Sequence, residues 1–319
     1  AAIRALRKVG YQPEHPIELV DFLAEEPSEW GLSCIGSRGM AGALTADHFA
    51  MVGPYQERLD DAIARMGGLP ADIAASMRKD VAAFVEIHIE QGPVLEAEDI
   101  PLGIVSGIAG IARVRLRIEG EAAHAGTAPM HMRADAGLAM ARLMLALRDA
   151  ASAEARKGRG HFTATIGVMR LEPNGANVVP GAAEAIVDIR AENDASMDDY
   201  LGAIEALVAE AAAAEGCRVA AAERLSRTFA VACDTRLQAL VKEAAEAHGL
   251  ETLPLASGAG HDAAFVARIA PAAMIFVPSK AGISHAPEEW TDNEAIARAA
   301  DVLALTLSTL DQRPLAPAA

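Results

Sequence analysis

The sequence has few aromatic residues, few cysteines and a deficit of positive charge. Phe, Trp and Tyr make up 4% of the 319 residues, and Cys34, Cys217 and Cys233 lie far apart without a C-x-x-C pair. Neither a disulfide framework nor a cysteine-rich zinc site is indicated, and a reducing, cytoplasmic location is expected. The 28 Lys and Arg residues are outnumbered by 44 Asp and Glu, giving a net charge of −16. This balance argues against a nucleic-acid or anionic-membrane partner.

Long apolar runs are also lacking. No uninterrupted stretch approaches the roughly 20 residues that cross a bilayer, and the first residues lack the basic and apolar regions of a signal peptide. Hydrophobic residues nevertheless make up 52% of the chain and charged residues 23%. This composition is typical of a globular, alanine-rich protein, and the length suggests about two domains.

Hydrophobic periodicity divides the chain into three segments. Residues 1–106 and 227–319 mix strand and helix patterns, whereas residues 107–226 have the order β-α-β-β-α-β of a ferredoxin-like unit. The predicted strands of this middle segment are 111–119, 161–171, 182–191 and 217–223, and its predicted helices are 134–157 and 197–215. The sequence therefore predicts an α/β protein in which a ferredoxin-like domain is inserted into another domain.

Two adjacent acids follow an apolar run near the start of the chain. Residues 17–24 (IELVDFLA) precede Glu25, Glu26 and Pro27, a pattern that predicts a buried strand ended by proline. Because successive strand side chains point to opposite sides, one acid can bind a metal while the other accepts a proton. The alternative is a solvated pair that ends the strand.

Two histidines lie where strand patterns place potential ligands. In residues 83–90 (AFVEIHIE), strict alternation puts His88 on the same face as Glu86. His285 follows the apolar strand predicted at 272–277, where α/β folds bind ligands. Each histidine alone is better explained by a structural role with a single hydrogen bond. Together with the acids, they predict a metal site with nitrogen and oxygen ligands.

Polar residues of the middle segment offer further candidates. His124 follows a predicted strand, where an imidazole can donate to a developing oxyanion. Asn177 lies in the turn NGANVVPG, where by itself it is better explained as shaping the turn. Arg190 ends a strand, and its guanidinium suits either a substrate carboxylate or a salt bridge to Asp188 or Glu192.

A glycine-rich stretch, SGAGHD, lies at residues 257–262. It is consistent with a helix N-terminus that binds anions, or with a tight turn capped by Asp262. It matches neither a dinucleotide-binding fingerprint nor a phosphate-binding P-loop.

Five motifs resemble those of one enzyme family. EIHIEQGPVLE, HAGTAPM, the pair NGANVVPG and DIR, SGAGHDA and SHAPEE occur in this order across essentially the whole chain. Together they resemble the hydantoinase/carbamoylase family of metal-dependent amidases, which is related to aminoacylase and carboxypeptidase-type metallopeptidases. The resemblance implies a metallopeptidase-like catalytic domain with a phosphorylase/hydrolase-like mixed sheet. It also implies that the inserted domain is a lid and dimerisation domain, and that the protein is a homodimer.

The resemblance assigns roles to individual residues. It implies that Glu25 is the general base and that His124 polarises the scissile carbonyl. The implied metal ligands are Glu26, His88 and His285. The implied substrate-binding residues are Gln91, His124, Asn177, Arg190 and Gly258. The expected cofactors are two divalent ions in the full-length enzyme, with zinc preferred and manganese, cobalt or nickel also compatible with such ligands.

The implied activity is hydrolysis of a linear amide or ureido C–N bond, chiefly in an N-carbamoyl-L-amino acid. Allantoate, a β-ureido acid and N-acyl amino acids are alternative substrates. The family also has an upstream H-x-D segment that supplies metal ligands, and neither His15 nor Asp21 in residues 1–24 fits it. An N-terminally truncated chain is therefore expected, with an inactive fragment as a further alternative.

Overall fold

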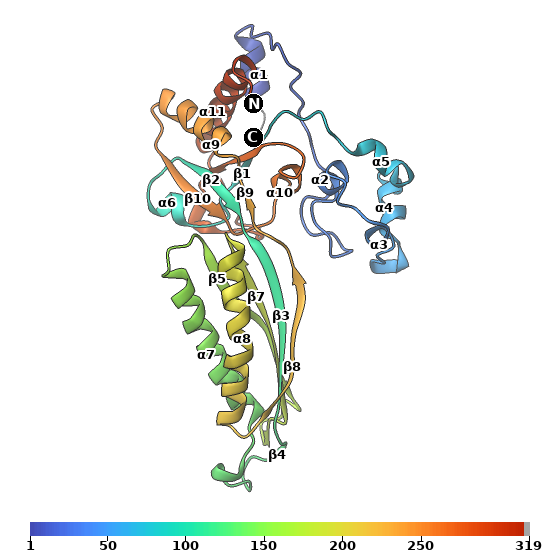
Figure 1. Cartoon of the computed structure of the whole chain (residues 1–319), viewed down its shortest axis with the longest axis vertical. Coiled ribbons are helices and arrows are strands. Elements are labelled where there is room, and N and C mark those ends of the chain that lie inside the picture. The colour runs from blue at the N-terminus through green and yellow to red at the C-terminus, as the bar shows by residue number, and fades with distance from the viewer. Residues whose placement is uncertain (316–319) are drawn as a thin grey trace. The chain divides into compact units, whose positions relative to one another are not determined.

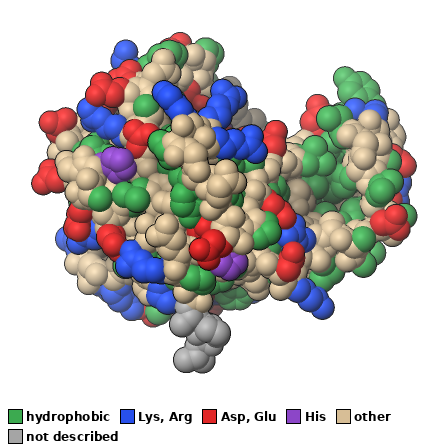
Figure 2. Space-filling model, turned by 90° about the horizontal axis from the view of Figure 1, so that it is seen from above, with side chains coloured by type: hydrophobic (Ala, Val, Ile, Leu, Met, Phe, Trp, Pro, Cys, Tyr) green, Lys and Arg blue, Asp and Glu red, His purple; other side chains and the backbone are tan. Residues whose placement is uncertain are grey.

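Residues 1–315 are described in a computed structural model and form two compact units (Figure 1). Unit 1 contains Ala1–Ile108 and the described residues from Ala232 onward, and unit 2 is the continuous segment Ala109–Val231. Within the described range, no helix is both long and apolar enough to cross a membrane. Acidic and basic side chains are interspersed over the face of the molecule shown in Figure 2.

Unit 2 is a four-stranded antiparallel sheet with two long helices. The strands lie in the order β5-β7-β3-β8, and both helices pack against the sheet and against each other. This connectivity confirms the predicted ferredoxin-like fold. The elements are β3 (Gly110–Glu119), α7 (Ala136–Ala155), β5 (Phe162–Glu172), β7 (Ala182–Ala191), α8 (Asp194–Ala214) and β8 (Arg218–Arg227). A small sheet joins β4 (Ala123–His124) to β6 (Val178–Val179), with a 3-10 turn at Met130–Met132.

Alternation along β3 builds the core of unit 2. Val114, Leu116 and Ile118 are buried against the helices. The arginines between them face away from this core and pair with acids on neighbouring strands, such as Arg115 with Glu223. One face of the sheet is therefore covered by helices and the other carries charge, as expected for an antiparallel sheet with one solvated face.

Unit 1 contains a mixed sheet in the order β1-β11-β2-β10, with β9 pairing beside β2. β1 runs parallel to β11 and β10 runs parallel to β2, whereas β11 and β2 are antiparallel. This arrangement confirms the predicted mixed α/β sheet. The strands are β1 (Phe84–Ile89), β2 (Leu102–Ile108), β9 (Val231–Ala232), β10 (Thr252–Ser257) and β11 (Ala272–Val277).

Helices cover the sheet of unit 1. α9 (Thr235–Ala247) and α11 (Asn293–Gln312) form a core with β2 and β11, and α10 (Ala263–Val266) packs against β1 and β11. The other helices are short: α1 (Ala2–Lys8), α2 (Ile35–Met40), α3 (Ala46–Phe49), α4 (Leu59–Arg65), α5 (Ile73–Ser76) and α6 (Val94–Ala97). Three 3-10 turns lie at Pro54–Gln56, Pro70–Asp72 and Lys280–Gly282.

The buried strand predicted for residues 17–24 is wrong. This segment is irregular, none of its residues is buried, and the side chain of Leu19 is 87% exposed. The carbonyls of residues 23–25 instead accept hydrogen bonds from the amides of residues 34–36, at the start of α2. An apolar run forms a strand only where a partner strand pairs with it. Here the last carbonyls of the run accept hydrogen bonds from the first turn of α2 instead.

Candidate metal centre

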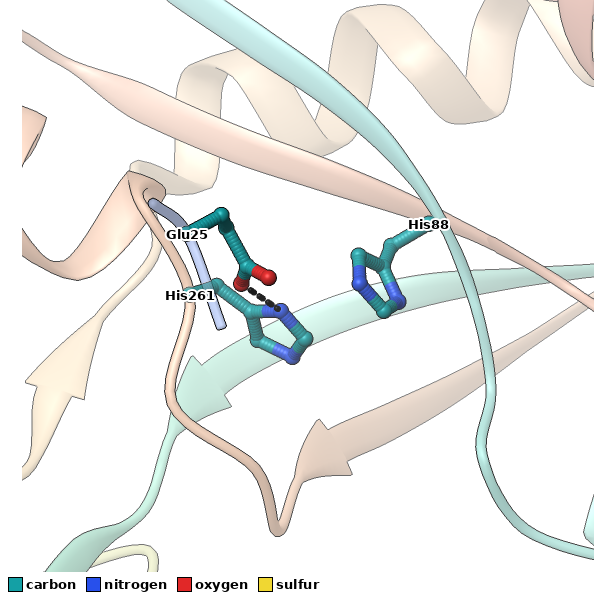
Figure 3. Close-up of side chains that lie close together, drawn as sticks. All are labelled: Glu25, His88 and His261. Atoms are coloured by element: carbon teal, nitrogen blue, oxygen red, sulfur yellow. Dashed lines mark ion pairs between the residues drawn. The ribbon is translucent and has the colours of Figure 1, made fainter. Parts of the chain in front are cut away.

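Three side chains from separate segments of unit 1 converge (Figure 3). Glu25 comes from the loop before α2, His88 from β1, and His261 from the loop between β10 and α10. One potential ligand atom from each lies within 4.8 Å of the others. Imidazole nitrogen and carboxylate oxygen are the ligands that zinc and neighbouring divalent transition metals accept.

The register of the sheet explains why His88 faces this cluster. Ile87 and Ile89 pack against the core under α9 and α11, so alternation along β1 turns His88 and Glu86 to the opposite face. The ring of His88 meets the ring of His261 edge-on, with centroids 4.4 Å apart. The predicted alternation in residues 83–90 is thereby confirmed.

His261 is the most enclosed member of the cluster, with 1% of its side chain exposed. Its Nε2 lies 2.7 Å from Ser257 Oγ. Its Nδ1 lies 3.9 Å from Glu25 Oε1 and 3.8 Å from Glu86 Oε1, and has no hydrogen-bond partner among the described residues. Burial, with a smaller effect of His88, lowers the pKa of His261 to about 3, so the ring is neutral at pH 7. A buried polar atom without a partner is one that a bound cation satisfies.

Three acids surround these histidines, and all have raised pKa values. Burial raises the pKa of Glu25 to about 7, assisted by repulsion from Glu26 and Asp262. Burial likewise raises the pKa of Glu86 to about 8, although the amide of Ala263 donates to its Oε2 at 3.0 Å. The pKa of Asp262 is also raised by burial. A divalent cation would relieve the repulsion among these carboxylates, so the donor set fits a metal ion.

The other two predicted ligands lie together. Glu26 Oε1 is 3.5 Å from His285 Nε2, and both side chains are 62% exposed. Gln91 Nε2 lies 3.3 Å from the same imidazole nitrogen and donates to Ser284 Oγ. The predicted ligands therefore fall into two groups, with Glu26 and His285 in one and His88 in the other.

The remaining predicted residues lie partly in unit 1 and partly in unit 2. Gly258 belongs to the loop that carries His261. His124 is on β4, and the amide of the residue after it donates to the carbonyl of Asn177 at 2.9 Å. Arg190, on β7, donates from Nε to Asp188 Oδ1 at 2.9 Å, one of the salt bridges anticipated for it. Unit 2 thus brings His124 and Asn177 together.

Sequence reasoning did not select His261 or Glu86 as members of the cluster. Both carried a signal: Glu86 shares the face of His88, and His261 follows a glycine-rich loop at the end of a strand. The glycines of residues 257–262 instead favour a backbone anion site or a tight turn. Only the folded chain shows that the His261 ring itself turns toward Glu25.

Comparisons with known proteins agree on one family. The sequence profile described as Peptidase family M20/M25/M40 matches residues 1–309. An N-carbamoyl-L-amino-acid amidohydrolase of Paenarthrobacter aurescens is 35% identical over 98% of this chain and 75% of its own length. An allantoate amidohydrolase of Bacillus subtilis is 36% identical over 91% of this chain and 69% of its own. A hydantoinase/carbamoylase family amidase of Burkholderia multivorans superposes with a TM-score of 0.89 at 33% identity, covering 98% of this chain and 75% of that one.

Proposed function

Because this chain belongs to peptidase family M20/M25/M40, and within it to the hydantoinase/carbamoylase amidases, we propose that it hydrolyses an N-carbamoyl-L-amino acid. The products are the free amino acid, CO2 and ammonia. The broader activity is that of its relatives, hydrolases that cleave C–N bonds. The observation that carries the proposal is the convergence of Glu25, His88 and His261 in unit 1.

Glu25 is proposed as the general base. A base works best when its pKa lies near the working pH, and burial raises the pKa of this carboxyl to about 7. In the deprotonated form it takes a proton from the attacking water. In the protonated form it returns that proton to the leaving nitrogen, so the residue is restored in each turnover.

Two divalent ions are proposed as cofactors. His88 and His261 are the nitrogen donors nearest to Glu25, and Glu26 with His285 forms the second group of donors. The unpartnered Nδ1 of His261 and the raised pKa values of the surrounding acids support a cation at the first group. When bound, such an ion supplies an activated water and polarises the substrate carbonyl.

The substrate's other groups are assigned to polar residues of both units. Gln91 and Gly258 in unit 1, and His124 and Asn177 in unit 2, are proposed to bind its polar atoms. Arg190 is proposed to bind the carboxylate, because the planar guanidinium matches a carboxylate with two parallel hydrogen bonds. We further propose that unit 2 acts as a lid and as the surface of a homodimer.

The test is ammonia release by purified protein loaded in turn with Zn²⁺, Mn²⁺, Co²⁺ and Ni²⁺. Substrates are several N-carbamoyl-L-amino acids, their D-enantiomers, a β-ureido acid and N-acetyl amino acids. Activity on the L-carbamoyl compounds, abolished by a chelator and restored by metal, is expected. Absence of turnover on every ureido substrate, together with fewer than two bound ions per chain, would contradict the proposal and favour the inactive-fragment alternative.

Allantoate is the second candidate substrate. A relative named allantoate amidohydrolase is 36% identical to this chain, about as similar as the carbamoyl-amino-acid amidohydrolase. Both substrates carry a carboxylate, so Arg190→Ala is expected to weaken binding of either. The ratio of kcat/KM for allantoate to that for N-carbamoyl-L-amino acids decides between them.

A further inference from the structure

The loop that carries Glu25 is held by the first turn of α2. The amides of residues 34–36 donate to the carbonyls of residues 25, 24 and 23, with N···O distances of 2.9, 3.1 and 2.9 Å. The two backbones are so close that a Cβ added at Gly36 would lie 2.7 Å from the Leu23 nitrogen. Because residues 17–28 form no strand or helix, the position of Glu25 follows the position of α2.

α2 is in turn joined to the loop that carries His261. Ser37 Oγ donates to Asp262 Oδ1 at 2.5 Å, and Asp262 directly follows His261. Both residues are buried, with 0% and 5% exposure, and they lie 225 positions apart in the sequence. A hydrogen bond to a buried carboxylate is stronger than one between neutral groups, because the low surrounding dielectric increases the interaction.

We propose that Ser37 and Asp262 are positioning residues that hold the carboxylate of Glu25 beside His261 and His88. The linkage runs from Asp262 through Ser37 to α2, and from the amides of α2 to the backbone of Glu25. The effect on catalysis, through placement of Glu25 as the base, rests on the proposed function. The hydrogen-bonded linkage from Asp262 to Glu25 does not. Misplacing a reacting group by about 1 Å costs roughly a hundredfold in rate, so a weakened linkage lowers kcat.

The experiment combines amide hydrogen exchange with steady-state kinetics on Ser37→Ala. Loss of the hydroxyl removes the bond to Asp262, so exchange of the amides of residues 34–36 is expected to quicken by about tenfold. Exchange in the α9 and α11 amides is expected to stay unchanged. The expected kinetic result is a fall in kcat of roughly ten- to a hundredfold, with KM within about twofold because the substrate contacts remain.

Thr306→Val is the matched control. Thr306 is also fully buried, and its Oγ1 donates at 2.8 Å to the Val302 carbonyl within α11. Its loss is expected to change neither exchange at residues 34–36 nor kcat. Equal effects of Thr306→Val and Ser37→Ala on these two readouts would overturn the proposal.

A second pair of variants tests the acceptor. Asp262→Asn keeps an oxygen that accepts from Ser37, whereas Asp262→Ala removes it, so the asparagine is expected to recover most of the protection and kcat that the alanine loses. If Ser37→Ala does not fold, Ser37→Cys retains a weaker donor and is expected to show a smaller change in the same direction.

The outcomes separate the linkage from the proposed function. Unchanged exchange at residues 34–36 in a folded Ser37→Ala protein overturns the linkage, whatever the activity. Faster exchange with unchanged kcat overturns the positioning role. If the unmodified chain hydrolyses no substrate, the proposed function fails, and the positioning of a catalytic base fails with it, while the exchange measurement still decides the linkage.

Discussion

The buried acid of unit 2 and the acids of the candidate metal centre in unit 1 have pKa values shifted in opposite directions. In unit 2, Glu154 is 5% exposed and pairs with Lys157 at 2.6 Å and with Arg159, and these hydrogen bonds lower its pKa to about 2. In unit 1, Glu25 and Glu86 are near histidines that they do not contact closely, and burial raises their pKa values to about 7 and about 8.

The difference separates stability from chemistry. An acid paired with basic side chains favours the folded state, whereas an acid held without such a partner opposes folding and is typical of functional sites. In unit 2, Glu154 is paired with Lys157 and Arg159, whereas at the candidate metal centre of unit 1 Glu25 and Glu86 lie 3.9 and 3.8 Å from a neutral histidine. Four substitutions test this comparison.

Glu25→Gln is expected to have the largest effect. The amide cannot accept a proton from water, so kcat of the metal-loaded protein is expected to fall by about a thousandfold, as for other general bases. Glu29→Gln, at an exposed acid a few residues along the chain, is the control and should retain full activity. Equal kcat values for the two variants would remove Glu25 from the mechanism.

Leu143→Ala is expected to lower the stability of unit 2. Leu143 lies on α7 and is fully buried in the core of unit 2, so its truncation costs about 2–5 kcal/mol of unfolding free energy. Leu145, two residues along α7, is 57% exposed, so Leu145→Ala is expected to change the free energy by less than about 0.5 kcal/mol. Urea denaturation followed by circular dichroism measures both. Similar losses would show that the assigned core face of α7 is wrong.

Glu86→Gln is expected to stabilise the metal-free protein at alkaline pH. Because the folded pKa of Glu86 is raised to about 8, the folded state binds more protons than the unfolded state above the ordinary value of 4.5. The stability of the unmodified protein therefore falls as pH rises from about 4.5 to about 8. Glutamine avoids the charge and still accepts from Ala263. The gain over the unmodified protein is expected to grow to about 1–3 kcal/mol between pH 5 and pH 8. A gain that shrinks with pH contradicts this sign.

Glu154→Gln is expected to have the smallest effect, with the opposite sign. Because the folded pKa of Glu154 is lowered to about 2, its contribution to stability is complete above the ordinary value of 4.5 and disappears as pH falls toward 2. The variant is therefore less stable than the unmodified protein at pH 7, and the difference narrows between pH 4.5 and pH 2. Glu210→Gln, at an exposed site on α8, is the control. Its denaturation midpoint should match that of the unmodified protein at every pH.

The sequence predicts unit 2 well because the signal is local. Along β3, buried aliphatic residues alternate with arginines, and only one register buries them all. β1 is read correctly for the same reason, which puts His88 on the right face. In both strands, the alternation of apolar and polar side chains identifies the face that packs against the core.

The candidate site is less predictable because its parts are brought together by contacts between distant segments. Residues 17–24 have strand-forming composition, yet their last carbonyls are bonded by the start of α2. His261 lies 173 positions after His88 in the sequence. Its ring lies beside Glu25 because of the path of the loop between β10 and α10, which has no periodic sequence pattern. Side-chain alternation gives no information about such a loop.

The residue pattern by itself determined the mixed α/β class, the ferredoxin-like middle segment, the family resemblance and the face on which His88 lies. These features follow from periodicity and from short motifs, both of which are properties of neighbouring residues. Only the tertiary structure decided that His261 joins Glu25 and His88, that Glu26 faces His285, and that Ser37 contacts Asp262. Such pairings depend on which distant segments the fold brings side by side. The Ser37–Asp262 pair is also buried, where a polar group needs a hydrogen-bond partner.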